Sequence, residues 1–99
     1  MYTDGSKTNK IQQANTFSGH ILEIKIFELD KTKDYPEGFK YSLIVVDPKT
    51  ENKILMDNHK PKKHHYHINN RQYVYKFKGI DQLFDDFQNL VKKHLGVDL

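Results

Sequence analysis

The stretch from Asp57 to His67, DNHKPKKHHYH, holds the residues of this sequence best suited to chemistry. Four of the six histidines of the chain lie in it, beside three lysines and a single acid, Asp57. An imidazole titrates close to cellular pH, so it can accept or donate a proton during a reaction. Lysine ammonium groups attract phosphates and stabilise the charge that develops on them. The stretch therefore predicts a site that binds anions or moves protons.

Spacing divides these histidines between the two faces of an expected strand. His65 and His67 are two residues apart and share one face, while His64 and Tyr66 share the other. Asp57 comes from the end of the preceding strand and can approach the first pair across the ladder. We expect His65 and His67 to act as general acid and base, with Asp57 orienting one ring.

The neighbouring polar residues are expected to bind a nucleic acid rather than to react with it. Lysine and arginine hold phosphates, and a tyrosine ring such as that of Tyr66 or Tyr73 can stack on a base. The expected binding set is Asn58, His59, Lys60, Lys62, Lys63, His64, Tyr66 and Arg71.

Three interpretations of this stretch compete. The first is a solvated basic loop and edge strand, since lysine protects sheet edges. The second is a nucleic-acid site, in whose active form one histidine takes the proton of a ribose 2′-hydroxyl and another protonates the leaving oxygen. The third is a metal site built from Asp57, His59, His65 and His67, because His-x-His is a ligand spacing. The nearby lysines repel a dication, so we expect no metal and no other cofactor.

The elements that must position these residues are five strands and one helix. Period-two alternation predicts strands over 21–29, 40–47, 53–57, 64–68 and 72–77. Short connections that contain turn residues make successive strands antiparallel. An apolar stripe at three- and four-residue spacing predicts a helix over 80–95, which Gly96 ends. We therefore expect an α+β fold, with a four- or five-stranded, mainly antiparallel sheet and one C-terminal helix packed on one face.

Residues 1–18 are polar and aperiodic, which predicts a flexible leader in front of a single α+β domain over 19–99. The chain has no cysteine, which excludes disulfides and thiolate chemistry and favours the cytoplasm. No apolar run resembles a signal peptide or a membrane span. The net charge of +3 and the pI of about 9.0 indicate an anionic partner.

Four short motifs follow one another in a recognisable order between residues 21 and 95. They are Tyr35-Pro36-x-Gly38, Lys40-Tyr41, Asp57-Asn58-His59 and His64-His65-Tyr66-His67. In order and spacing the sequence resembles the TumE family, the toxin-side proteins of predicted type II toxin–antitoxin pairs. The resemblance implies a toxin whose partner is an antitoxin with a DNA-binding domain. It makes Asp57, Asn58, His65 and His67 family-like positions.

Size and family resemblance together favour RNA as the target, since an RNA-directed activity is the common choice for toxins of this size. We predict a toxin component of a type II pair that acts on RNA as a metal-independent endoribonuclease. The alternative is a non-enzymatic module that binds RNA or a protein and acts by occupancy. A homo-oligomer is compatible with either function.

Overall fold

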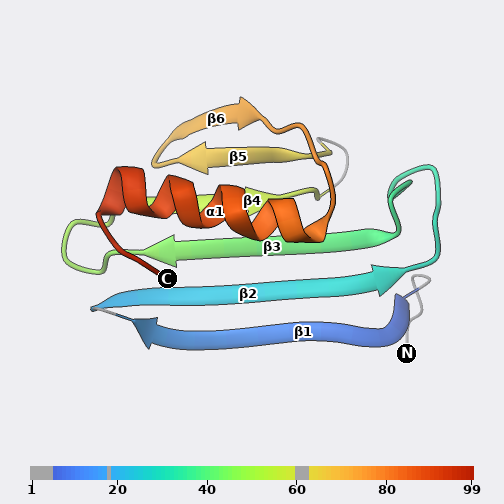
Figure 1. Cartoon of the computed structure of the whole chain (residues 1–99), viewed down its shortest axis with the longest axis horizontal. Coiled ribbons are helices and arrows are strands. Elements are labelled where there is room, and N and C mark those ends of the chain that lie inside the picture. The colour runs from blue at the N-terminus through green and yellow to red at the C-terminus, as the bar shows by residue number, and fades with distance from the viewer. Residues whose placement is uncertain (1–5, 18, 60–62) are drawn as a thin grey trace.

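The chain folds as one antiparallel sheet followed by one helix (Figure 1). The computed structural model describes residues 6–17, 19–59 and 63–99. Six strands lie side by side in chain order, so each pairs with its neighbours in the sequence. They are β1 (Ser6–Phe17), β2 (His20–Leu29), β3 (Phe39–Val46), β4 (Lys53–Asp57), β5 (His65–Ile68) and β6 (Arg71–Val74), and the helix is α1 (Ile80–Leu95). The predicted α+β class, the antiparallel sheet and the C-terminal helix are confirmed.

The N-terminal segment differs from its expectation. Residues 6–17, predicted to belong to a flexible leader, form β1 and pair antiparallel with β2. The sheet therefore has six strands, where four or five were predicted. A ladder of main-chain hydrogen bonds requires no apolar side chains, so a polar sequence can add a strand at a sheet edge. Residues 1–5 and residue 18 of the predicted leader lie outside the described residues.

The last predicted strand is shorter than its alternating pattern. β6 ends at Val74, and after a last main-chain hydrogen bond from Tyr75 N–H to the His64 carbonyl at 3.2 Å the chain leads to α1. Tyr75 donates a hydrogen bond from Oη to Oδ2 of Asp86 in the helix at 2.6 Å. Phe77 stacks on the His64 ring, with the ring centres 4.6 Å apart. The alternation over 72–77 thus has two causes. Up to Val74 it reflects strand pairing, and after Val74 it reflects the contacts of Tyr75 with α1 and of Phe77 with His64.

The core lies between α1 and one face of the sheet, here called the covered face. Leu83, Phe87 and Val91 of α1 are fully buried. They meet the inward residues of β3 and β4, where the register pairs Leu43 with Met56 and Val45 with Ile54. In Figure 1, α1 runs along the middle of the sheet in front of β4. Within the described ranges, α1 is too short and too polar to cross a membrane.

The opposite side of the sheet, here called the open face, has no helix or strand of the described residues packed on it. Alternation assigns to it the residues that lie between the core positions. One row runs straight across the strands through register pairs, from Lys25 to Ser42, from Ser42 to Asp57 and from Asp57 to His65. Residues 8 to 17 positions apart in the sequence therefore become neighbours on this face.

Candidate functional site

The motifs of the sequence analysis meet at one end of the sheet. The amide of Asn58 ties them together, since its Oδ1 accepts from the backbone N–H of Tyr41 at 2.9 Å and its Nδ2 donates to the carbonyl of Phe39 at 2.7 Å. Asn58 is buried. Nearby, Gly38 takes a φ of 82° and donates its N–H to the Tyr35 carbonyl at 3.0 Å. Asn58, predicted to bind substrate, here holds the start of β3 against the end of β4.

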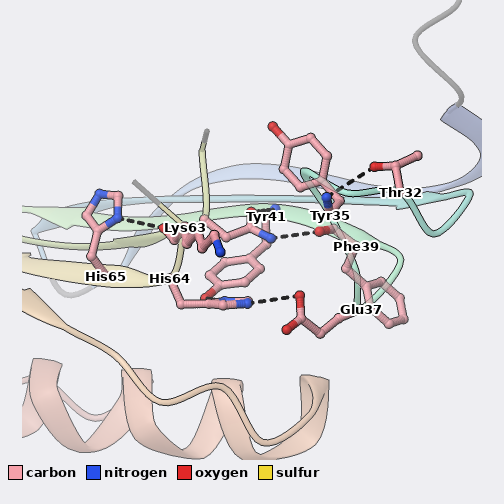
Figure 2. Close-up of polar contacts among 9 residues, drawn as sticks. Thr32, Tyr35, Glu37, Phe39, Tyr41, Lys63, His64 and His65 are labelled. Atoms are coloured by element: carbon pink, nitrogen blue, oxygen red, sulfur yellow. Dashed lines mark hydrogen bonds and ion pairs between the residues drawn. The ribbon is translucent and has the colours of Figure 1, made fainter. Parts of the chain in front are cut away.

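His64 lies on the covered side of the sheet with a partner at each ring nitrogen (Figure 2). Its Nδ1 is 2.7 Å from Oη of Tyr41, and its Nε2 is 3.1 Å from Oε1 of Glu37. A neutral ring satisfies both contacts, because Nε2–H donates to the carboxylate while Nδ1 accepts from the hydroxyl. Burial, and then the negative charges nearby, raise the pKa of Tyr41 well above its usual range, so its hydroxyl remains a donor. On this side of the sheet, both ring nitrogens of His64 and the hydroxyl of Tyr41 thus have partners within the protein.

His65 faces the other way, and its hydrogen-bond partners are of a different kind. Its Nε2 lies 2.9 Å from Oδ1 of Asp57, and its Nδ1 lies 2.8 Å from the carbonyl oxygen of Lys63. Both partners are acceptors, so both contacts are hydrogen bonds only when both ring nitrogens carry protons. Figure 2 shows the His65 ring and its link to Lys63 on the side of the strand away from His64. Lys63 has a φ of 62°, a left-handed conformation uncommon outside glycine.

The structure brings the three predicted catalytic residues together. Asp57 is the register partner of His65, as alternation across the ladder predicts. The rings of His65 and His67 meet edge to face, with centres 4.9 Å apart and planes at 74°. His65 is only 5% exposed, so its ring lies inside this cluster rather than at its surface.

A pocket of about 370 Å³ opens on the open face next to Asp57. Its walls come from β2, β3 and the end of β4, and they consist of Lys25, Phe27, Lys40, Tyr41, Ser42, Asp57 and His59. The backbone N–H of His59 lies 3.4 Å from Oδ1 of Asp57, the same oxygen that meets His65. Oδ2 of the carboxylate makes neither contact. The pocket thus combines two cations, a carboxylate anchored through one oxygen, and the exposed His59.

Several residues of the predicted binding set lie away from this pocket. Tyr66 packs against the core and stacks on Tyr73, with ring centres 4.9 Å apart. Arg71 is the register partner of Ile68, which packs against the core, so Arg71 belongs to the covered face. Lys63 is exposed in the turn before β5. Lys60 and Lys62 lie outside the described residues.

Sequence reasoning missed five residues of the pocket. They are Lys25, Phe27, Lys40, Tyr41 and Ser42. The alternation over 21–29 was a signal that could have found two of them, because it places Lys25 and Phe27 on the face of the strand opposite Ile24. The position of Ser42 beside Asp57 follows only from the register of β3 and β4.

The metal interpretation required Asp57, His59, His65 and His67 to surround one ion. In residues 6–17, 19–59 and 63–99, no three or more histidines and acids gather closely enough to hold a metal ion.

Fold and site together define a small α+β domain that presents a basic, histidine-containing pocket on the uncovered side of an antiparallel sheet. Residues 3–95 match the family model described as Toxin TumE. The match covers nearly the whole chain, and the chain belongs to the TumE toxin family, as the four motifs predicted. Membership marks it as a toxin of a toxin–antitoxin system and implies an antitoxin partner. No curated protein and no solved structure matches the chain.

Proposed function

We propose that this TumE-family toxin cleaves RNA without a metal ion, at the open-face pocket beside Asp57. One observation carries the proposal. A carboxylate held by a buried histidine forms the wall of a pocket that also contains two lysines and an exposed histidine. These are the groups that phosphate binding and proton transfer require.

Lys25 and Lys40 supply the positive charge for a phosphate. The Lys25 ammonium lies 3.6 Å from the carboxylate of Glu23, and both side chains are about 40% exposed. An exposed ion pair of this kind contributes little, so a phosphate can take over the lysine. Binding that depends on such contacts weakens steeply as salt rises, because phosphates release their counterions on contact.

The proposed reaction is an internal attack within the RNA. The ribose 2′-oxygen forms a bond to the adjacent phosphorus, and the bond from phosphorus to the 5′-oxygen of the next nucleotide breaks. One proton leaves the 2′-hydroxyl and one proton reaches the departing 5′-oxygen. The products are a 2′,3′-cyclic phosphate and a 5′-hydroxyl, and the electron count needs no redox partner.

Two groups on the pocket wall can carry these protons. We assign the 2′-proton to the carboxylate of Asp57 and the donation to the leaving oxygen to the imidazolium of His59. Both side chains line the pocket, so both can touch the reacting atoms. General acid–base help of this kind accelerates reactions by about 10²–10⁴-fold.

The roles of His65 and His67, predicted to be catalytic, are proposed to be indirect. His65 is buried and both of its nitrogens have partners, which suits it to fix Asp57 through Oδ1. His67 packs edge-on against His65 and braces that ring. In this proposal Asp57 and His59 are catalytic, and His65 and His67 are positioning residues.

The partner proposed for the toxin is an antitoxin with a DNA-binding domain. The test is the neighbouring reading frame and its product. A helix-turn-helix protein that co-purifies with the toxin supports this partner, and a product with no DNA-binding element contradicts it.

The function is tested with purified toxin and unstructured RNA, with and without EDTA. Cleavage is expected to persist in EDTA and to leave a cyclic phosphate end. His59→Ala should lower the rate by about 10²–10⁴-fold without changing the melting temperature. His94→Ala, an exposed histidine at the end of α1, is the matched control and should cleave normally.

Two results contradict the proposal in different ways. Activity lost in EDTA and restored by one divalent metal would refute metal independence. Growth arrest on induction with no cleavage of any RNA would remove the enzyme and leave the alternative, a module that acts by occupancy.

A further inference from the structure

Phe27 is an aromatic side chain in an unexpected place. The structure describes the side chains of five phenylalanines, and four of them, Phe39, Phe77, Phe84 and Phe87, belong to the core cluster or pack against it. Phe27 does neither. It is half-buried on the open face, where it lines the pocket beside Asp57. Core packing therefore does not explain why an aromatic ring stands at this position.

Charged neighbours surround this ring on its own face of the sheet. Lys40 is its direct register partner on β3, at a separation of about 5 Å between side-chain origins. Lys25 lies two residues back along β2, about 7 Å away. A ring beside two cations is the combination with which proteins bind single strands, since the ring stacks on a base and the charges hold the backbone.

We propose that Phe27 stacks on an unpaired nucleobase while Lys25 and Lys40 hold the flanking phosphates, so that the ligand of the pocket is single-stranded RNA. The identity of the ligand rests on the proposed function, and the stacking role goes beyond it. Aromatic rings stack on any base, because every base has a π face, and this contact needs no particular sequence. A pocket of about 370 Å³ is of the size that takes a small ligand such as one nucleotide.

The same geometry selects against duplex RNA. A paired base is already stacked on both sides, so it cannot offer a face to a ring recessed in a pocket. Proteins that read RNA by stacking accordingly take single-stranded segments whose bases can be splayed out. The chain should therefore prefer unpaired RNA.

A protein partner is the competing occupant of this surface. The centres of protein interfaces are depleted in lysine and acidic residues relative to the rest of the surface. Around Phe27 the pocket contains Lys25, Lys40 and Asp57 instead. This charge favours a phosphate-bearing ligand over the antitoxin.

Binding is measured separately from cleavage. The probe is a fluorescent single-stranded oligoribonucleotide with 2′-O-methyl groups, which lacks the attacking hydroxyl, and its duplex serves for comparison. Phe27→Leu should weaken single-strand binding by about 5- to 100-fold, the range that loss of one stacking contact gives. Phe27→Tyr should bind as tightly as the parent. Ile21→Ala, which removes an exposed apolar side chain at the other end of β2, is the matched control and should bind normally.

A second variant covers the case in which Phe27→Leu does not fold. Lys40→Gln keeps a polar side chain, shorter by one atom, and removes one cation. It should weaken binding and reduce the slope of log affinity against log salt by about 0.7, the value for one contact with a single strand. An unchanged slope would show that Lys40 touches no phosphate and would overturn the clamp.

The remaining outcomes separate this inference from the proposed function. Parent-like binding by folded Phe27→Leu, or equal binding of duplex and single strand, overturns the stacking role even if the toxin cleaves RNA. If Phe27→Leu binds RNA normally but no longer retains a co-purified antitoxin, the ring belongs to a protein interface, and the stacking role is overturned. Binding that depends on Phe27, with no cleavage of unmodified RNA, supports the stacking role and removes the endoribonuclease.

Discussion

His64 and His65 are consecutive in the chain, yet they occupy two different chemical environments. His64 turns to the covered face, where Tyr41 and Glu37 supply one donor and one acceptor and Phe77 packs on the ring. His65 turns to the open face, where both partners are acceptors and one of them is a carboxylate on the wall of a pocket. Residue type alone therefore does not determine the environment of a histidine. The face of the strand on which the ring lies decides its partners.

The largest difference between the two faces should appear in folding stability. Phe87 is 1% exposed under the sheet, so Phe87→Ala should lower the free energy of unfolding by about 3–5 kcal/mol. Leu55 is half-buried on the open face, and Leu55→Ala should cost only about 1 kcal/mol. Urea denaturation of both variants measures the contrast. Equal losses would show that the open face is packed as tightly as the core.

The next effect tests the link between His65 and Asp57. His65→Ala removes a hydrogen bond to a carboxylate, which should cost about 1.5–3 kcal/mol of stability. It should also slow RNA cleavage, because Asp57 loses the group that fixes Oδ1. A double-mutant cycle with Asp57→Asn, read by both urea denaturation and cleavage rate, should show strong coupling. Additive effects would mean that the 2.9 Å contact carries neither stability nor activity.

His64 provides the matched test on the other face. His64→Ala should cost about 1–2 kcal/mol, since it removes ring stacking and a hydrogen bond to Tyr41. Its cleavage rate, measured well below the melting temperature, should stay close to that of the parent. A large loss of activity in a folded His64→Ala variant would erase the functional distinction between the two histidines.

The smallest effect is confined to alkaline pH. Burial raises the pKa of Tyr41 and of Tyr75, and the bond to Asp86 raises that of Tyr75 further. Both remain neutral in the folded chain, while in the unfolded chain they ionise near pH 10. Their contribution to stability is therefore complete below about pH 10 and declines as the pH rises beyond it. Urea midpoints between pH 8 and 11 should fall, and Tyr41→Phe should make the decline shallower.

Much of the fold could be read from local patterns. The stripe of Leu83, Phe87 and Val91 predicts the helix because burial on one side imposes a period of 3.6 residues. The same reasoning missed β1, since SKTNKIQQANTF contains no alternating apolar set. A strand at the edge of a sheet is held by its neighbour's main chain, and main-chain hydrogen bonds leave no mark on composition. The pattern after Val74 misled for the opposite reason, because Tyr75 and Phe77 contact Asp86 and His64 rather than a strand.

The site was predictable only where its residues are close in sequence. The approach of Asp57 to His65 follows from alternation on two strands joined by a short connection. Phe27 and Lys40 could not be linked to them in this way, because their proximity depends on the register of β2 with β3 and on the bend after Leu29. Burial also had no local signature. Nothing in HHYH indicates that the second histidine is enclosed and the first one shielded by Phe77.

The position of α1 after every strand has a consequence during synthesis. A ribosome releases the six strands first, and each hairpin can form as soon as its two halves emerge, because all pairings are between sequence neighbours. The inward row of Leu43, Val45, Ile54 and Met56 then has no cover until residues 80–95 follow. A nascent chain therefore carries an exposed apolar surface and an unbraced sheet until translation of the helix.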